Sequence, residues 1–140
     1  MMMKVLVAVL LLSISVNAQL GMMVGGPTES TTTIQEALKV ISSAEEFAKI
    51  PKATQNLKKI FGQAKVLKYT SQVVAGTNKA YLLSTKRGFE CFRIYVRFTG
   101  KASLSKYGRG TSEDNVWGEC TNFAANSLTA IDLAKSVFKN

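Results

Sequence analysis

The pattern that most constrains the fold is a strict alternation of side chains near the middle of the chain. The apolar set is Phe92, Ile94, Val96 and Phe98, and the residues between them are Arg93, Tyr95 and Arg97. Successive side chains of an extended strand point to opposite faces, so this period of two predicts a β-strand with one buried face. Phe98 continues the buried set, which leaves open whether it lies in the core or serves as a surface anchor.

Three other segments have strand patterns, and turn residues separate them. The first begins at Gln63 and has a face formed by Leu67, Tyr69, Ser71 and Val73. The second covers Ala80–Thr85 after a turn at residues 76–78, and the last covers Ala102–Tyr107 after Gly100. Short strands joined by such turns predict an antiparallel meander. Residues 108–118, which include the single tryptophan, Trp117, have the composition of a loop.

Helical periodicity appears before the strands and again after them. Thr33 and Glu36 have the spacing of a capping box, and apolar residues then recur every three or four positions as far as Lys49. Pro51 ends or kinks this helix, and one or two helical turns follow before Gly62. The predicted fold class is α+β: an antiparallel β-sheet wrapped around one long N-terminal α-helix, with an extra C-terminal helix.

The C-terminal segment, residues 126–140, is predicted to be an amphipathic helix because its apolar residues share one broad face. We expect this helix to dock on the sheet. The alternative is a helix that lies on a membrane surface, but such helices are usually more basic.

The first thirty residues differ in composition from the rest. Met1–Ala18 has a basic head, an apolar run too short to span a bilayer and small residues at its end, which together predict a secretory signal peptide. Residues 19–30 are rich in Gly, Met and polar residues and are predicted to be a flexible N-terminal arm, followed by a domain over residues 31–125. In a secreted, extracellular protein we expect Cys91 and Cys120, the only cysteines, to form a disulfide; the alternative is two free thiols.

The composition disfavours catalysis. The 140 residues include no histidine, so the chain has no Ser-His-Asp or Cys-His pair and no imidazole metal ligand. Two cysteines are too few for a four-thiolate zinc site. We therefore expect no enzyme activity, no metal and no cofactor. The formal charge of +9 is spread along the chain without a basic run or interleaved aromatic residues, so we expect no nucleic-acid partner, and no apolar run predicts a membrane span.

The most informative short motif ends the first predicted strand, where the sequence reads Gln72, Val73, Val74, Ala75, Gly76. A motif with three fixed positions arises by chance in some unrelated chains, so its surroundings have to support it. Here Tyr69–Asn78 resembles the first-hairpin strand of the cystatins, the tight-binding inhibitors of papain-like cysteine proteases. Phe89–Val96, continued by Gly100 and Leu104–Lys106, is similar to the strand that leads into the second hairpin of that family.

The resemblance implies a cystatin-like fold and a secreted, reversible inhibitor of papain-like cysteine proteases such as cathepsins, which we expect to be a monomer. It also implies that three segments fill the active-site cleft of the protease. These are the arm at Gly25 and Gly26, the first hairpin at Gln72–Gly76, and the second hairpin at Arg97 and Phe98.

The chain departs from the family pattern in three ways. Arg97 and Phe98 stand where secreted cystatins usually have Pro-Trp, unless Trp117 is that tryptophan, displaced by an insertion. The cysteines of the first family disulfide are absent. In the second disulfide, the partner of Cys91 would be Cys120, later in the chain than the family pattern expects.

Several alternatives remain at this stage. Gln72–Gly76 could be merely a strand and a turn, and Gly25 with Gly26 could be a plain linker. The competing function is that of a cystatin-fold protein without inhibitory activity, acting as a basic host-defence or membrane-active protein through its charge and its C-terminal helix.

Overall fold

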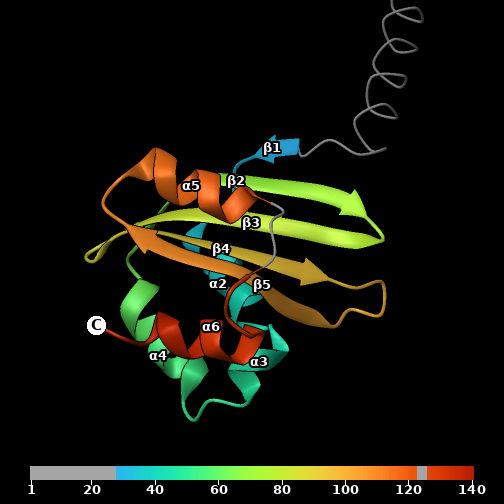
Figure 1. The fold of residues 1–140 in the computed structure, drawn as a ribbon, viewed down its shortest axis with the longest axis horizontal. Helices are drawn as coiled ribbons and strands as arrows, with labels where there is room; N and C mark the ends of the chain where they lie inside the picture. The colour runs from blue at the N-terminus through green and yellow to red at the C-terminus, as the bar shows by residue number, and fades with distance from the viewer. Residues whose placement is uncertain (1–27, 123–125) are drawn as a thin grey trace, which may run out of the picture.

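The structure is a computed structural model that describes residues 28–122 and 126–140 (Figure 1). Its centre is an antiparallel sheet with the strand order β1-β2-β3-β4-β5. The strands are β1 (Thr28–Ser30), β2 (Lys65–Val74), β3 (Gly76–Thr85), β4 (Gly88–Val96) and β5 (Ala102–Gly110). The four predicted strands are therefore present as a meander from β2 to β5, and a short fifth strand extends the sheet at β1. The turn predicted at residues 76–78 was wrong, because β3 begins at Gly76 and the chain turns at Ala75.

Strand β1 comes from the end of the segment that we predicted to be a flexible arm. Thr28 pairs with Ser71, and Ser30 pairs with Tyr69. The pairing satisfies backbone groups on the edge of β2 that would otherwise need water, so residues 28–30 belong to the sheet. The predicted signal peptide and the rest of the arm lie outside the described residues.

Strand β2 contains a bulge that changes which residues share a face. Val66 pairs with Leu83 and Lys68 pairs with Leu82, so Leu67 is an extra residue in the ladder. Tyr69 packs against the main core, whereas Leu67 packs on the opposite face of the sheet. Our prediction that Leu67 and Tyr69 lie on one face was wrong, because a bulge shifts the alternation by one residue.

The predicted long helix is divided in two. Helix α2 (Ile34–Ser42) begins at Thr33, whose side chain accepts a hydrogen bond from the Glu36 N–H at 3.2 Å, as the capping-box spacing predicted. The helix ends at Ser42, and the short helix α3 (Glu45–Ala48) follows. The prediction of one helix as far as Lys49 was therefore wrong.

Contacts with strand β5 account for the break between α2 and α3. Ala44 forms an isolated parallel bridge with Ala102. The buried carboxylate of Glu46 accepts hydrogen bonds from the Leu104 N–H at 2.6 Å and from the Ser103 hydroxyl at 3.1 Å. A continuous helix would direct the backbone N–H and C=O of Ala44 along its own axis, so the bridge to β5 requires the interruption.

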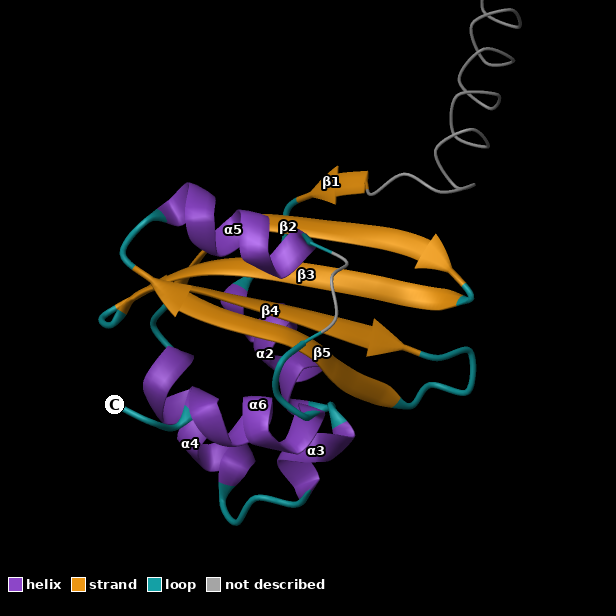
Figure 2. Ribbon diagram, in the orientation of Figure 1, coloured by secondary structure: helices purple, strands orange, loops and turns teal. Residues whose placement is uncertain are grey.

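The helices lie on both faces of the sheet (Figure 2). Helices α2, α3, α4 (Ala53–Phe61) and α6 (Ala130–Val137) cover one face. The largest side chains of this core include Phe47, Leu57, Phe61, Tyr81, Phe92 and Ile94. The C-terminal helix is docked as predicted, although it is shorter: Leu133, Ala134 and Val137 are buried, and α6 packs beside β5.

Helix α5 (Glu113–Thr121) covers the other face, in a segment that we predicted to be largely loop. Ser112 caps it by accepting a hydrogen bond from the Asn115 N–H. Val116 and Cys120 are buried against Leu82 and Cys91 of the sheet. The loop prediction was wrong because the helix carries glycine and few apolar residues, and burial against the sheet outweighs that weak propensity.

Cys91 and Cys120 form a disulfide that joins β4 to α5, with a Cα–Cα separation of 5.9 Å. The predicted pairing is confirmed. Among the helices of the described ranges, none combines the length and the apolar character that crossing a bilayer requires.

Candidate functional site

Two hairpin turns lie side by side at one end of the sheet. The β2–β3 turn is at Ala75, between Val74 and Gly76, and the β4–β5 turn covers residues 97–101. Thr77, just after the first turn, pairs with Val96, just before the second. Both turns are at the right of Figure 1. The structure therefore brings the two predicted hairpin sites together at one edge of the protein.

The first turn depends on a glycine and on a tyrosine from the next strand. Gly76 has φ of +126°, a backbone conformation that residues other than glycine rarely adopt. A Cβ atom at this position would lie 2.7 Å from the Tyr95 hydroxyl oxygen. That hydroxyl donates a hydrogen bond to the Ala75 carbonyl. Tyr95 thus connects the turn at Ala75 to strand β4.

The residues before this turn present apolar side chains to solvent. Val73 is 45% exposed and Val74 is 43% exposed, whereas Val66 and Tyr69 of the same strand pack against the core. Valine side chains are stiff at χ1, so they lose little conformational entropy when a partner covers them.

The second turn is closed by its own backbone. The Gly100 N–H donates to the Arg97 carbonyl at 2.9 Å, and the Arg97 N–H donates to the Lys101 carbonyl at 2.8 Å. Gly100 has φ of +89°. A β-turn followed by a residue at positive φ is a common three-residue hairpin loop. The loop begins directly after β4, so Phe98 no longer follows the alternation of the strand.

The structure distinguishes between a core position and a surface position for Phe98. Its side chain is 83% exposed and lies at the tip of the second turn, so it is not a core residue. Arg97 beside it is also exposed. Among the described residues, the exposed large hydrophobic side chains are Val73, Val74, Phe98 and Leu128, and three of these four belong to the two hairpins.

Trp117 lies elsewhere. It is half-buried on α5 among Leu67, Phe89 and the disulfide cluster, and the Lys68 ammonium is 5.8 Å from its ring centre. The tryptophan therefore packs on one face of the sheet rather than at the hairpin edge, as our alignment of Arg97 and Phe98 with the second hairpin predicted.

Strand β1 begins on the side of the sheet that faces the two hairpins. Gly25 and Gly26 lie outside the described residues. The first described residue, Thr28, pairs with Ser71, which directly precedes Gln72. Since β1 runs antiparallel to β2, the chain enters the sheet from the end where the hairpins are (Figure 1).

The sequence did not identify two residues that position this edge. Tyr95 was visible only as an outward-facing member of an alternating strand, and its contact with Ala75 depends on the pairing of β3 with β4. Glu46 was one polar residue of an amphipathic helix, yet it binds the start of β5 close to the second turn. In neither case does the local pattern around the residue contain the signal.

The edge has the properties of a binding surface. Exposed valine and phenylalanine side chains suit an apolar cleft, and Arg97 and Lys101 add exposed positive charge. In the part of the chain that the structure describes, no group of three or more Cys, Asp or Glu residues is placed to hold a metal ion.

Comparison with curated proteins finds a partial similarity, and no family model matches the chain. The similarity is to a cystatin. The chain is 39% identical to Cystatin-A2 of Dictyostelium discoideum over 51 residues, which are 36% of this chain and 54% of that protein. The chain thus matches about half the length of this relative. The similarity supports a relationship to the cystatins and favours an inhibitor over an enzyme.

Proposed function

We propose that this protein is a reversible inhibitor of papain-like cysteine proteases. Its inhibitory edge, defined as Gln72–Gly76 together with Arg97 and Phe98, would occupy the active-site cleft of the enzyme. The observation that carries the proposal is the gathering of exposed Val73, Val74 and Phe98 on two adjacent hairpins, because the other large apolar side chains of the described strands β2 to β5 are buried or half-buried. The partial similarity to a cystatin supports the same conclusion.

The shape of the first hairpin explains how it would fill a cleft without being cleaved. A papain-like protease cleaves an extended backbone whose carbonyl lies over the catalytic sulfur. The turn at Ala75 bends the chain away from that path, and Tyr95 holds the turn in place. A preformed turn also loses less conformational freedom on binding than a flexible peptide does.

The second hairpin and the arm would add contacts on either side. Phe98 at the tip of its turn is an aromatic anchor of the kind that is enriched in binding hot spots. Arg97 would pair with acidic groups on the enzyme. In the arm, Gly25 and Gly26 would allow Met23 and Val24 to lie extended along the cleft.

We also propose that the protein is exported. Met1–Ala18 has the composition of a signal peptide. The disulfide between Cys91 and Cys120 is of a kind that persists in oxidising compartments.

The competing membrane-active function has less support. It would require α6 to present its apolar residues to lipid, but Leu133, Ala134 and Val137 are buried in the core. We therefore put forward inhibition as the function.

The decisive experiment is a titration of papain with the purified protein and with the Val74→Asp variant. The aspartate would place an unpaired charge in a desolvated cleft, so we expect the variant to lose several kcal/mol of binding free energy. The matched control is Leu128→Asp, because Leu128 is similarly exposed, at 48%, and lies outside both hairpins. Equal inhibition by the Val74→Asp variant and the wild type would show that the edge is not the site.

A further inference from the structure

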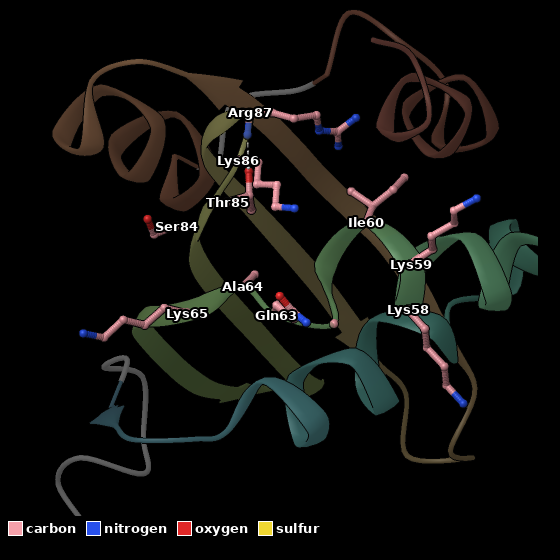
Figure 3. A pocket seen from close by; sticks show the side chains of 11 residues that line it. Lys58, Lys59, Ile60, Gln63, Ala64, Lys65, Ser84, Thr85, Lys86 and Arg87 are labelled. Atoms are coloured by element: carbon pink, nitrogen blue, oxygen red, sulfur yellow. Dashed lines mark hydrogen bonds between the residues drawn. The ribbon is translucent and has the colours of Figure 1, made fainter.

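A second surface of the protein gathers positive charge at the end of the sheet opposite the two hairpins. There, a hollow of about 900 Å³ lies between the end of α4, the start of β2 and the β3–β4 turn. Figure 3 shows Lys58 and Lys59 on one side of it and Lys65 on the other, with Lys86 and Arg87 on the turn. We call the surface formed by these five residues the basic groove.

The charge of the basic groove is not balanced by acidic residues in its lining, which contains no aspartate or glutamate. Arg87 is less available to a ligand than the lysines are, because its guanidinium forms a 2.5 Å ion pair with buried Glu90 and packs over the Phe61 ring. The four lysines are exposed. Figure 3 shows that the side chains of Lys58, Lys59 and Lys65 point outward from the rim of the hollow, so their ammonium groups surround it. Four exposed ammonium groups around one hollow produce a local positive potential, which attracts a ligand with several negative charges.

The chemistry of the lining narrows the class of ligand. Single-stranded nucleic acid is usually held by aromatic side chains that stack on its bases, and no aromatic residue lines the groove. Stable attachment to a membrane surface combines basic charge with buried apolar side chains, and the exposed large hydrophobic residues of the described chain all lie outside the groove. Lysine ammonium groups act as point charges that need no stacking or bidentate geometry. We propose that the basic groove binds a sulfated polysaccharide.

The position of the groove keeps it separate from the inhibitory edge. Lys65 begins β2 and Val74 ends it, and a strand of ten residues spans about 30 Å. A polysaccharide in the groove would therefore leave the two hairpins uncovered. The proposal does not depend on protease inhibition, since binding to a polysaccharide can be measured without any enzyme.

The test compares two triple variants of equal charge. In the first, Lys59, Lys65 and Lys86 of the groove are replaced by Gln; in the control, the exposed residues Lys39, Lys49 and Lys135 are replaced by Gln. Binding of a short heparin oligosaccharide is measured by calorimetry over a range of salt concentrations. We expect the groove variant to lose roughly tenfold or more in affinity and to show a smaller dependence on salt, because fewer counterions are released. The control variant should keep most of the affinity.

Three results would overturn the proposal. An equal loss in both variants would mean that net charge alone attracts the oligosaccharide. Tighter binding of a single-stranded oligonucleotide, or of vesicles that contain phosphatidylserine, would assign the groove to that ligand instead. A papain titration in the presence of the oligosaccharide gives a separate readout, and we expect it to be unchanged.

Discussion

The two ends of the sheet are built in opposite ways. At the hairpin end, the apolar side chains of Val73, Val74 and Phe98 are exposed to solvent. At the other end, the carboxylate of Glu90 is completely buried. It accepts hydrogen bonds from the Thr85 hydroxyl at 2.6 Å, from the Arg87 guanidinium at 2.5 and 3.2 Å, and from the Tyr107 hydroxyl.

The difference suggests that the Glu90 end of the sheet mainly affects stability, whereas the hairpin end mainly affects binding. A buried carboxylate is tolerated only when its partners remain in place, so loss of Glu90 or of one of its partners lowers the free energy of unfolding. Arg87 also donates to the carbonyls of Val137 and Lys139 and thereby holds the end of α6. Exposed apolar side chains contribute little to folding, which leaves the hairpin end free to change its affinity for a partner without changing stability.

The largest expected effect is on the free energy of unfolding and comes from removing the buried carboxylate of Glu90. Glu90→Ala removes the carboxylate and leaves the Arg87 guanidinium, whose side chain is only 20% exposed, without its ion pair. We expect a loss of about 3 to 5 kcal/mol in the free energy of unfolding, measured by urea denaturation. Inhibition of papain by the protein that remains folded should not change, because the hairpins are at the other end.

The matched control for this variant is Glu119→Ala, which removes an exposed carboxylate from α5. Its effect on the free energy of unfolding should stay within about 0.5 kcal/mol. If Glu90→Ala weakened inhibition under conditions where the variant is fully folded, the claim that the Glu90 end affects only stability would be wrong.

A crossed comparison of two aromatic residues sharpens the contrast. Phe98→Ala should weaken inhibition by about 2 kcal/mol, roughly thirtyfold in affinity, and leave stability almost unchanged. Trp117→Ala should do the reverse, because Trp117 is half-buried on α5 and packs with the disulfide cluster. Inhibition constants and thermal melts of both variants provide the measurement. If Trp117→Ala gave the larger loss of inhibition with its melt unchanged, the role assigned to the second hairpin would be wrong.

The smallest expected effect concerns alkaline pH at the buried end. Burial, followed by the hydrogen bond to Glu90 and its charge, raises the pKa of the Tyr107 hydroxyl above its ordinary value near 10. A raised pKa in the folded state contributes stability that is fully present below the unfolded pKa and is lost as pH rises toward the folded pKa. The Tyr107 contribution should therefore fall by about 1 kcal/mol between pH 10 and pH 11.

This pH effect can be isolated with Tyr107→Phe, which removes the titrating group and keeps the ring. Urea denaturation at pH 10 and pH 11 should show a smaller decrease in stability for the variant than for the wild type. The same decrease in both proteins would mean that ionisation of Tyr107 plays no part in it.

The sequence predicted the elements whose pattern is local. The alternation from Phe92 to Val96 correctly placed one face of β4 in the core, and Thr33 correctly marked the start of α2. It could not predict the break between α2 and α3. Ala44 fits the apolar stripe of a single helix and is indeed buried, but the interruption depends on its bridge to Ala102, which is far away in the sequence.

The candidate site shows the same division. The sequence correctly predicted that Gln72–Gly76 lies at the first hairpin and that Gly76 is the glycine that its turn needs. The exposure of Phe98 was not, because its position in the alternating series matched that of a core residue. Only the end of β4 at Val96 separates the two cases, and strand ends depend on the pairing partner rather than on local composition.

The self-contained second turn makes this protein a convenient scaffold for changing target preference. Its backbone hydrogen bonds join only residues 97, 100 and 101, and the side chains of Phe98 and Thr99 project outward from it. Randomising these two positions would therefore vary the contact surface while the framework stays constant. Under the proposed function, selection of such a library against different proteases would yield variants that differ in specificity and share one core.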